Sequence, residues 1–211
     1  MGLPPHITAT TGMDALSHAV EAYTNNTYNT KLEKDLAKKA VKLIYENLEV
    51  VYKDGSNLEA RQNMQLAAFY AGRAFSRGSV GYVHAIGHAL GGLYNTPHGV
   101  AMSSLLPLVM KQYGKAAHLR LAELYDASSM QTDAHTTEEK ANAFIAWMED
   151  INARMHIPKY PPTLELKDID EIAERAYKEG NPLYPTPVTW SKDDFIGFLM
   201  EIHQNKTFAE S

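Results

Sequence analysis

The stretch "TKLEKDLAKKAVKLIYENLEVVYKDGSN", residues 30–57, sets the pattern for the whole chain. Apolar side chains recur in it every three or four positions from Leu32 to Leu48, the spacing that places them on one face of an α-helix. Thr30 and Glu33 form a capping-box pattern at its start, and the "KDGSN" turn ends it. The sequence therefore predicts an amphipathic helix here.

The same period recurs along the rest of the chain. Further helices are predicted after the capping-box pattern Ser56-x-x-Glu59, at 117–127, after the box Thr136-x-x-Glu139, at about 167–179 and at 191–204. The links between them are Pro-rich or polar, and neither strand alternation nor hairpin dipeptides recur. Because all the loops are short, we expect one all-α helical bundle domain over residues 1–211.

Composition narrows the class of protein. Hydrophobic residues make up 45% of the 211 and charged residues 21%, which is typical of a soluble globular protein. The net charge of -5 is spread out, with no basic run to bind nucleic acid, and no apolar run approaches the ~20 residues of a membrane span. The absence of cysteine excludes disulfides, iron–sulfur clusters and thiol catalysis, and it suits a reducing cytosol. We therefore expect a cytoplasmic protein in which any metal has nitrogen and oxygen ligands.

Residues 81–99, "GYVHAIGHALGGLYNTPHG", contain His84, His88 and His98 and no charged side chain. His84 and His88 are four positions apart and would share one helical face. This resembles a two-histidine zinc spacing, but Ala85 stands where a zinc peptidase needs its glutamate base, so a peptidase is excluded. The histidines are either metal ligands or core residues that bond to backbone carbonyls.

His98 reaches His84 only if the helix breaks between them. On one straight helix the two residues would be ~21 Å apart, too far for both to bind one ion. The "NTP" at 95–97 supplies a break: Pro97 is expected as the first residue of a new helix, with Asn95 or Thr96 as its cap. A turn there would fold His98 back toward His84.

A second stretch, "TGMDALSHAVEAY" at residues 11–23, places Asp14 and His18 four apart beside an apolar stripe. A carboxylate and an imidazole one turn apart can chelate one cation, but Thr11-x-x-Asp14 is also a capping-box pattern, which would make Asp14 structural. Both interpretations stay open on these residues alone. Together the two stretches offer one carboxylate and three imidazoles, which suits Fe(II) or Zn(II) with a position left for a substrate oxygen.

These stretches, the histidine-rich one extended to "GYVHAIGHALGGLYNTPHGVAMSSLLP", resemble the iron-dependent alcohol dehydrogenase family, which includes lactaldehyde reductases, propanediol dehydrogenases and butanol dehydrogenases. The resemblance continues to the end of the chain and implies the family's C-terminal helical domain, of the dehydroquinate synthase-like kind. It implies metal ligands at Asp14, His18, His84 and His98, and a histidine near the nicotinamide at His88. The intact Asp-x-x-x-His favours the alcohol dehydrogenase branch over glycerol dehydrogenases.

The resemblance also implies an activity. It indicates the metal-carrying half of an NAD(P)-dependent enzyme that interconverts small alcohols or diols and aldehydes, with Fe(2+) or Zn(2+) as Lewis acid on the alcohol oxygen and His88 relaying the alcohol proton. Family members begin with a nucleotide-binding α/β domain, and this chain begins beyond it. We therefore expect an artificially shortened chain rather than a gene fragment, inactive by itself. Loss of that domain would expose an apolar wall and favour self-association into a homo-oligomer.

Other classes of protein compete with this one. A metal-binding hydrolase would need a His-Asp dipeptide and a ferritin-like di-iron bundle would need Glu-x-x-His pairs, and the sequence contains neither. A third alternative is a non-catalytic helical assembly domain. Glu21 is either an acceptor for a ligand histidine or a solvated residue. The remaining histidines are expected at the surface or its edge: His6, His118, His135, His156 and His203.

Overall fold

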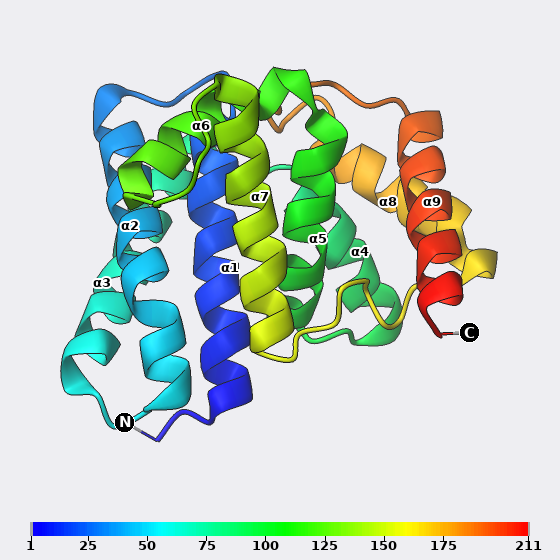
Figure 1. Ribbon diagram of the computed structural model, residues 1–211. Helices are drawn as coiled ribbons and strands as arrows, with labels where there is room; N and C mark the ends of the chain where they lie inside the picture. The colour runs from blue at the N-terminus through cyan, green and yellow to red at the C-terminus, as the bar shows by residue number, and fades with distance from the viewer. Residues whose placement is uncertain (1, 211) are drawn as a thin grey trace.

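The computed structural model describes residues 2–210, and every regular element in that range is a helix (Figure 1). In chain order these are α1 (Pro5–Thr24), α2 (Lys31–Lys53), α3 (Leu58–Gly78), α4 (Tyr82–Tyr94), α5 (His98–Tyr113), α6 (Lys115–Ser128), α7 (Thr137–Arg154), the 3-10 helix η1 (Leu166–Asp168), α8 (Ile169–Gly180) and α9 (Lys192–Glu210). The all-α prediction is confirmed. Within the same range no helix is both long enough and apolar enough to cross a bilayer.

α1 is the central helix of the bundle (Figure 1). It contacts α2, α3 and α5, and more weakly α6, while α6 and α7 pack against each other. Its side chains from Ala9 to Tyr23 are largely buried. Burial of each large apolar side chain among them contributes roughly 1.5–3 kcal/mol to the stability of the folded state. On the other side of α5 lies α4, which α8 covers, and α9 packs on α8. α5 therefore joins the central helix to the α4–α8–α9 side of the molecule.

Two of the four capping-box patterns noted in the sequence are formed at helix starts. The boxes that begin at Thr30 and Thr136 are both formed. The box predicted at Ser56 is wrong, because the side chain of Asn57 caps α3 instead. Ser56 is held by Asp54, which accepts hydrogen bonds from its amide at 2.9 Å and its hydroxyl at 2.5 Å. This local turn takes the serine out of the capping position and moves the helix start one residue later.

The capping role suggested for Asp14 is also wrong. α1 begins at Pro5, so Thr11 and Asp14 lie inside the helix rather than at its start. The Thr11 hydroxyl donates to the carbonyl of Ile7 at 2.7 Å, an ordinary bond of a threonine within a helix. The carboxylate of Asp14 is therefore free to serve a site beside α1.

The break between α4 and α5 occurs at the predicted "NTP", but its residues act differently. Asn95 has a left-handed backbone with a φ of 54°, and the Thr96 hydroxyl donates to the carbonyl of Leu90 at 3.2 Å. Both residues close the end of α4, so neither caps α5. Pro97 occupies the capping position and is not the first helical residue, which corrects the prediction. The left-handed residue reverses the chain and returns His98 toward α4.

Two local features fix α5 against its neighbours. Pro107 lacks an amide hydrogen, which leaves the carbonyl of Ser103 without its helical partner, and the side-chain amide of Asn152 on α7 donates to it at 2.7 Å. Near the start of α5, a Cβ added to Gly99 would come within 2.8 Å of the carbonyl oxygen of Thr10. α5 therefore lies in close backbone contact with α1, which sets the distance between their functional side chains.

Candidate metal centre

Three side chains from three different helices converge beside α1. The Nε2 atom of His98, on α5, lies 3.2 Å from Oδ1 of Asp14, on α1, and Nε2 of His84, on α4, lies 3.7 Å from the same oxygen. All three potential ligand atoms lie within 4.8 Å of one another. Three of the four ligands predicted from the sequence are thus brought together by the tertiary structure.

The chemistry of these atoms fits a divalent cation. Oδ1 of Asp14 and Nε2 of His84 are buried, and neither makes a hydrogen bond with the described residues. Buried polar atoms of native proteins are almost always partnered, so two unpaired acceptor-type atoms side by side point to a ligand between them. One carboxylate oxygen and two imidazole nitrogens form a donor set that Fe(II) and Zn(II) both accept.

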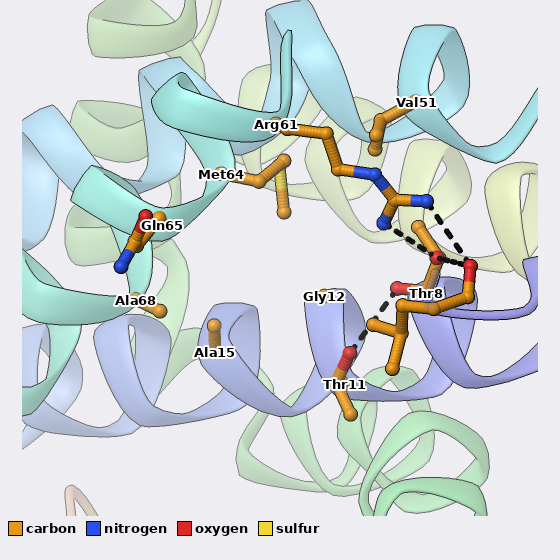
Figure 2. A pocket seen from close by; sticks show the side chains of 10 residues that line it. Thr8, Thr11, Gly12, Ala15, Val51, Arg61, Met64, Gln65 and Ala68 are labelled. Carbon is orange, nitrogen blue, oxygen red and sulfur yellow. Dashed lines mark hydrogen bonds between the residues drawn. The ribbon is translucent and has the colours of Figure 1, made fainter. Parts of the chain in front are cut away.

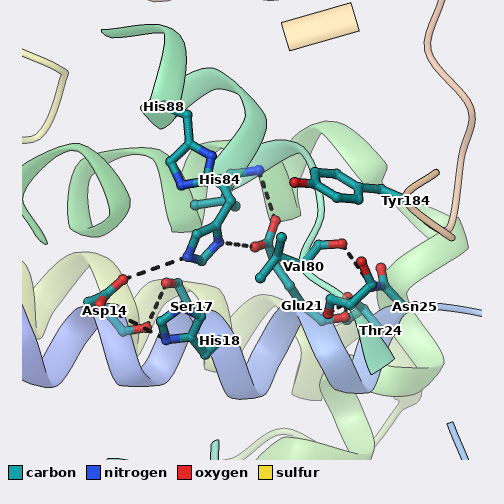
Figure 3. Close-up of polar contacts among 12 residues, drawn as sticks. Asp14, Ser17, His18, Glu21, Thr24, Asn25, Val80, His84, His88 and Tyr184 are labelled. Carbon is teal, nitrogen blue, oxygen red and sulfur yellow. Dashed lines mark hydrogen bonds and ion pairs between the residues drawn. The ribbon is translucent and has the colours of Figure 1, made fainter. Parts of the chain in front are cut away.

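Glu21 orients His84 from the side away from the cluster (Figure 3). It is only 1% exposed, its Oε2 lies 2.5 Å from Nδ1 of His84, and its Oε1 accepts the backbone N–H of Val83 at 2.8 Å. A carboxylate accepts hydrogen bonds, so Nδ1 of His84 carries a hydrogen toward Glu21, and in the neutral ring Nε2 then carries the lone pair on the side of Asp14. Glu21 is thus the acceptor for His84, a candidate ligand, and is not a solvated residue.

The electrostatics of the cluster follow from burial and from these carboxylates. Burial alone would lower the pKa of His84, but Glu21 and Asp14 outweigh it and raise that pKa to about 9. Burial works to raise the pKa of Asp14, but its contacts with His84 and His98 hold that pKa well below its usual range. Burial lowers the pKa of His18 to about 4, despite the nearby Asp14. The cluster therefore favours a positive charge next to Asp14, which a bound cation would supply in place of a proton.

His18 lies beside this cluster in a stacked position. Its ring is 4.5 Å from that of His84 and 4.3 Å from that of Phe75 on α3, measured between centroids. Its Nδ1 is 3.9 Å from Oδ2 of Asp14, and neither ring nitrogen belongs to the group of three converging ligand atoms. Its role as a fourth ligand stays a prediction.

His88 borders the cluster on its solvent side. Its side chain is 43% exposed, and its ring centroid lies 5.6 Å from that of His84 and 5.5 Å from that of His98. Its Nδ1 lies 2.7 Å from Oε1 of Glu179 on α8. Sequence reasoning missed Glu179, because it is distant in the chain and no local pattern marks it. As predicted, none of the other histidines is buried: His6, His118, His135, His156 and His203.

A separate cavity of about 340 Å³ lies between α1, α2 and α3 (Figure 2). Arg61 on its wall donates to the hydroxyl of Thr8 at 2.9 Å and to the carbonyl of Leu3 at 3.1 Å, so its guanidinium is already engaged in hydrogen bonds within the chain. None of the predicted site residues lines this cavity. The candidate metal centre lies elsewhere, and the exposed side chains of His88 and His98 border it on the solvent side.

The fold and the cluster together define a class: a helical domain whose central helix and the α4–α5 pair carry a candidate metal centre. The family described as "Fe-containing alcohol dehydrogenase family, C-terminal" matches residues 8–202. The chain therefore belongs to the Fe-containing alcohol dehydrogenase family, in its C-terminal part. This membership decides against the hydrolase and di-iron alternatives.

Individual relatives agree with the family match. The chain is 41% identical over 183 residues to 1,3-propanediol dehydrogenase of Citrobacter freundii, covering 86% of this chain and 47% of that protein. It is 36% identical over 207 residues to alcohol dehydrogenase 4 of Saccharomyces cerevisiae, covering 96% and 52%. A solved structure of alcohol dehydrogenase from Oenococcus oeni superposes with a TM-score of 0.88 at 35% identity, covering 95% of this chain and 52% of that one. The chain thus spans about half the length of the relatives it matches.

Proposed function

We propose that this chain is the metal-carrying catalytic half of an NAD(P)-dependent alcohol dehydrogenase that interconverts small primary alcohols or diols and aldehydes. The observation that carries the proposal is the convergence of Oδ1 of Asp14 with Nε2 of His84 and Nε2 of His98, the first two of these atoms being buried and without a hydrogen bond among the described residues. Relatives named for 1,3-propanediol, for butanol with NADPH and for methanol with NAD support the substrate class and the cofactor.

In this proposal Asp14, His84 and His98 hold Fe(II) or Zn(II), with His18 as a fourth ligand. A bound ion of this kind supplies Lewis acidity toward the alcohol oxygen. Asp14 contributes the negative charge that favours the cation, and the Glu21 contact keeps the lone pair of His84 available. Asp14, His18 and Glu21 lie on α1, whereas His84 lies on α4 and His98 on α5, so the packing of these three helices holds the ligand atoms at fixed separations.

His88 is proposed to accept the proton of the alcohol. Its imidazole lies beside two of the candidate ligands and reaches solvent, so it can pass a proton from the site to water. The nicotinamide dinucleotide takes the hydride. Binding of this dinucleotide requires a nucleotide-binding α/β domain as partner. The chain by itself is therefore proposed to be inactive. We further propose a cytoplasmic homo-oligomer that binds no nucleic acid.

Metal content and stability test the binding part of the proposal. We expect the purified chain to take up about one Zn(II), or Fe(II) without oxygen, and to unfold at higher temperature with either ion. The His84→Ala/His98→Ala double variant should lose both effects, whereas a His6→Ala/His203→Ala control should keep them. Folded wild-type protein that binds neither ion, or a double variant that binds like wild type, would overturn the proposal.

A fusion protein tests the catalytic part. The preceding half of the Citrobacter freundii 1,3-propanediol dehydrogenase, joined ahead of this chain, would restore the length of the relatives. We expect NAD(P)-dependent oxidation of 1,3-propanediol, lost in Asp14→Ala and kept in a variant of an exposed acid such as Glu46→Ala. A folded, metal-loaded fusion that oxidises no small alcohol with either dinucleotide would contradict the assignment.

A further inference from the structure

Glu179, near the end of α8, accepts two hydrogen bonds on one carboxylate oxygen. Nδ1 of His88 on α4 lies 2.7 Å from its Oε1, and the hydroxyl of Tyr184 donates to the same atom at 2.8 Å. Tyr184 comes from the loop between α8 and α9, so three separate segments meet at this carboxylate. Neither Glu179 nor Tyr184 belongs to the candidate metal centre, and no sequence pattern singled them out.

The hydrogen positions at this contact follow from the chemistry of the three groups. Burial works to raise the pKa of Glu179, but the hydrogen bonds from His88 and Tyr184 outweigh it and lower that pKa. Glu179 is therefore ionised at neutral pH and can only accept hydrogen bonds. Burial and the Glu179 carboxylate raise the pKa of Tyr184, which keeps its hydroxyl protonated and donating. The imidazole of neutral His88 then has its hydrogen on Nδ1, so Nε2 carries a free lone pair.

His88 lies beside the candidate metal centre, so the contact with Glu179 fixes the orientation of a ring at that site. Its ring lies within 5.6 Å of the ring of His84 and stacks on that of His98, with centroids 5.5 Å apart. A histidine that is 43% exposed would, without a fixed partner, exchange between its two tautomers and rotate in water. The carboxylate on α8 suppresses both motions, because one oxygen accepts from Nδ1 and is itself held by the tyrosine.

We propose that Glu179 and Tyr184 are positioning residues for His88, which hold its imidazole in the Nδ1–H tautomer so that Nε2 can accept the proton of an alcohol substrate. The identity of that proton donor rests on the proposed function. The tautomer itself depends on neither metal nor cofactor, because every group that fixes it lies within this chain. A merely structural role, in which Glu179 only ties α8 to α4, predicts lost stability without a change of tautomer.

The tautomer of His88 can be measured directly in this chain. Long-range 15N–1H correlation spectra of the labelled, metal-free protein, followed to a pH at which the His88 signals no longer change, distinguish the two tautomers. We expect wild-type His88 to be the Nδ1–H form. In Glu179→Ala the ratio of Nδ1–H to Nε2–H should fall about fivefold to tenfold, the equivalent of one net hydrogen bond. Glu174→Ala, on the same helix, should leave the ratio unchanged.

The proposed role of Tyr184 is tested by a second pair of variants. Tyr184→Phe should produce a smaller fall in the same ratio, and Tyr177→Phe on α8 should produce none. A wild-type His88 in the Nε2–H form would overturn the proposal even if every variant unfolded. A folded Glu179→Ala protein with the wild-type ratio would also overturn it, and equal spectra for Tyr184→Phe and Tyr177→Phe would remove Tyr184 from it.

The same samples separate this inference from the proposed function. Asp14→Ala should abolish zinc binding while His88 keeps the Nδ1–H tautomer, because Asp14 makes no contact with Glu179. Wild-type protein that binds no zinc but holds His88 in the Nδ1–H form would contradict the metal proposal alone. Zinc binding with the opposite tautomer would contradict the role of Glu179 alone.

Discussion

Glu21→Gln is the substitution that tests most sharply how the candidate metal centre is built. The native carboxylate uses one oxygen for the backbone N–H of Val83 and the other for Nδ1 of His84. Glutamine has almost the same shape but only one acceptor oxygen, and its other end donates. It can accept a hydrogen bond from Val83 or from Nδ1 of His84, but not from both. If the amide NH₂ faces His84, Nδ1 must become the acceptor and Nε2 must carry the hydrogen, which prevents that atom from binding a metal.

The expected losses of stability and of zinc affinity follow from these two contacts. A buried donor left without an acceptor costs about 1–3 kcal/mol, and Glu21 is 1% exposed, so solvent cannot replace the lost partner. We expect the free energy of unfolding to fall by about that amount. Loss of a partner that orients a ligand histidine typically weakens metal binding about 10–100-fold. This corresponds to about 1.4–2.7 kcal/mol of binding free energy, and the forced tautomer of His84 favours the upper end.

The assay measures zinc affinity by competition with a chelator and unfolding by denaturant titration, in the same preparations. Glu46→Gln is a suitable control, because Glu46 is exposed on α2 and, among residues 2–210, pairs only with Lys42, at 3.5 Å. An exposed ion pair of this kind contributes at most about 1 kcal/mol to stability and nothing to the site. Glu21→Gln protein that is folded and binds zinc within twofold of wild type would refute the reasoning.

Three further predictions concern stability and are checked by chemical or thermal unfolding. Gly99→Ala should destabilise the chain by about 1–3 kcal/mol, because its Cβ would collide with the α1 backbone. Gly72→Ala, with open space around the added Cβ, should instead stabilise the chain by about 0.5–1 kcal/mol. Equal effects of the two substitutions would contradict the close approach of α1 and α5. Asn152→Ala should lower the free energy of unfolding by about 1–3 kcal/mol, because it removes the donor to the Ser103 carbonyl. The loss should be smaller in a Pro107→Ala background, where residue 107 regains an amide hydrogen for that carbonyl. Strictly additive losses would show that the two residues do not act on the same carbonyl. Backbone and hydroxyl donors at the start of α7 lower the pKa of Glu139, so its contribution is present above its unfolded value of 4.5 and is lost as the pH falls through the lower folded pKa. The melting-temperature deficit of Glu139→Ala at neutral pH should therefore shrink and vanish as the pH is lowered through that folded pKa, and a constant deficit would contradict the capping role.

The local parts of the fold could be predicted because they depend on neighbours in the chain. Apolar spacing and the boxes at Thr30 and Thr136 specify helices through contacts only three or four residues long. The predicted helix caps that were wrong also depended on contacts between residues close in the chain. Asn57 replaced Ser56 as a cap because Asp54 also competes for the serine, and Asn95 closed the preceding helix instead of opening the next. Both outcomes depend on which of two short-range hydrogen bonds wins, and composition does not decide that.

The sequence by itself determined that the chain is helical, that it lacks thiol chemistry and that one carboxylate and several imidazoles stand at spacings suited to a metal. Only the tertiary structure decided which of them converge. Asp14, His84 and His98 meet because α1 and α5 approach closely and the chain reverses at Asn95, and these are long-range packing effects. The contacts of Glu21 and Glu179 were likewise undetermined, because hydrogen bonds between side chains far apart in sequence leave no periodic trace. Sequence patterns record the faces that a helix buries, whereas the partner that meets each face is fixed only when the helices pack.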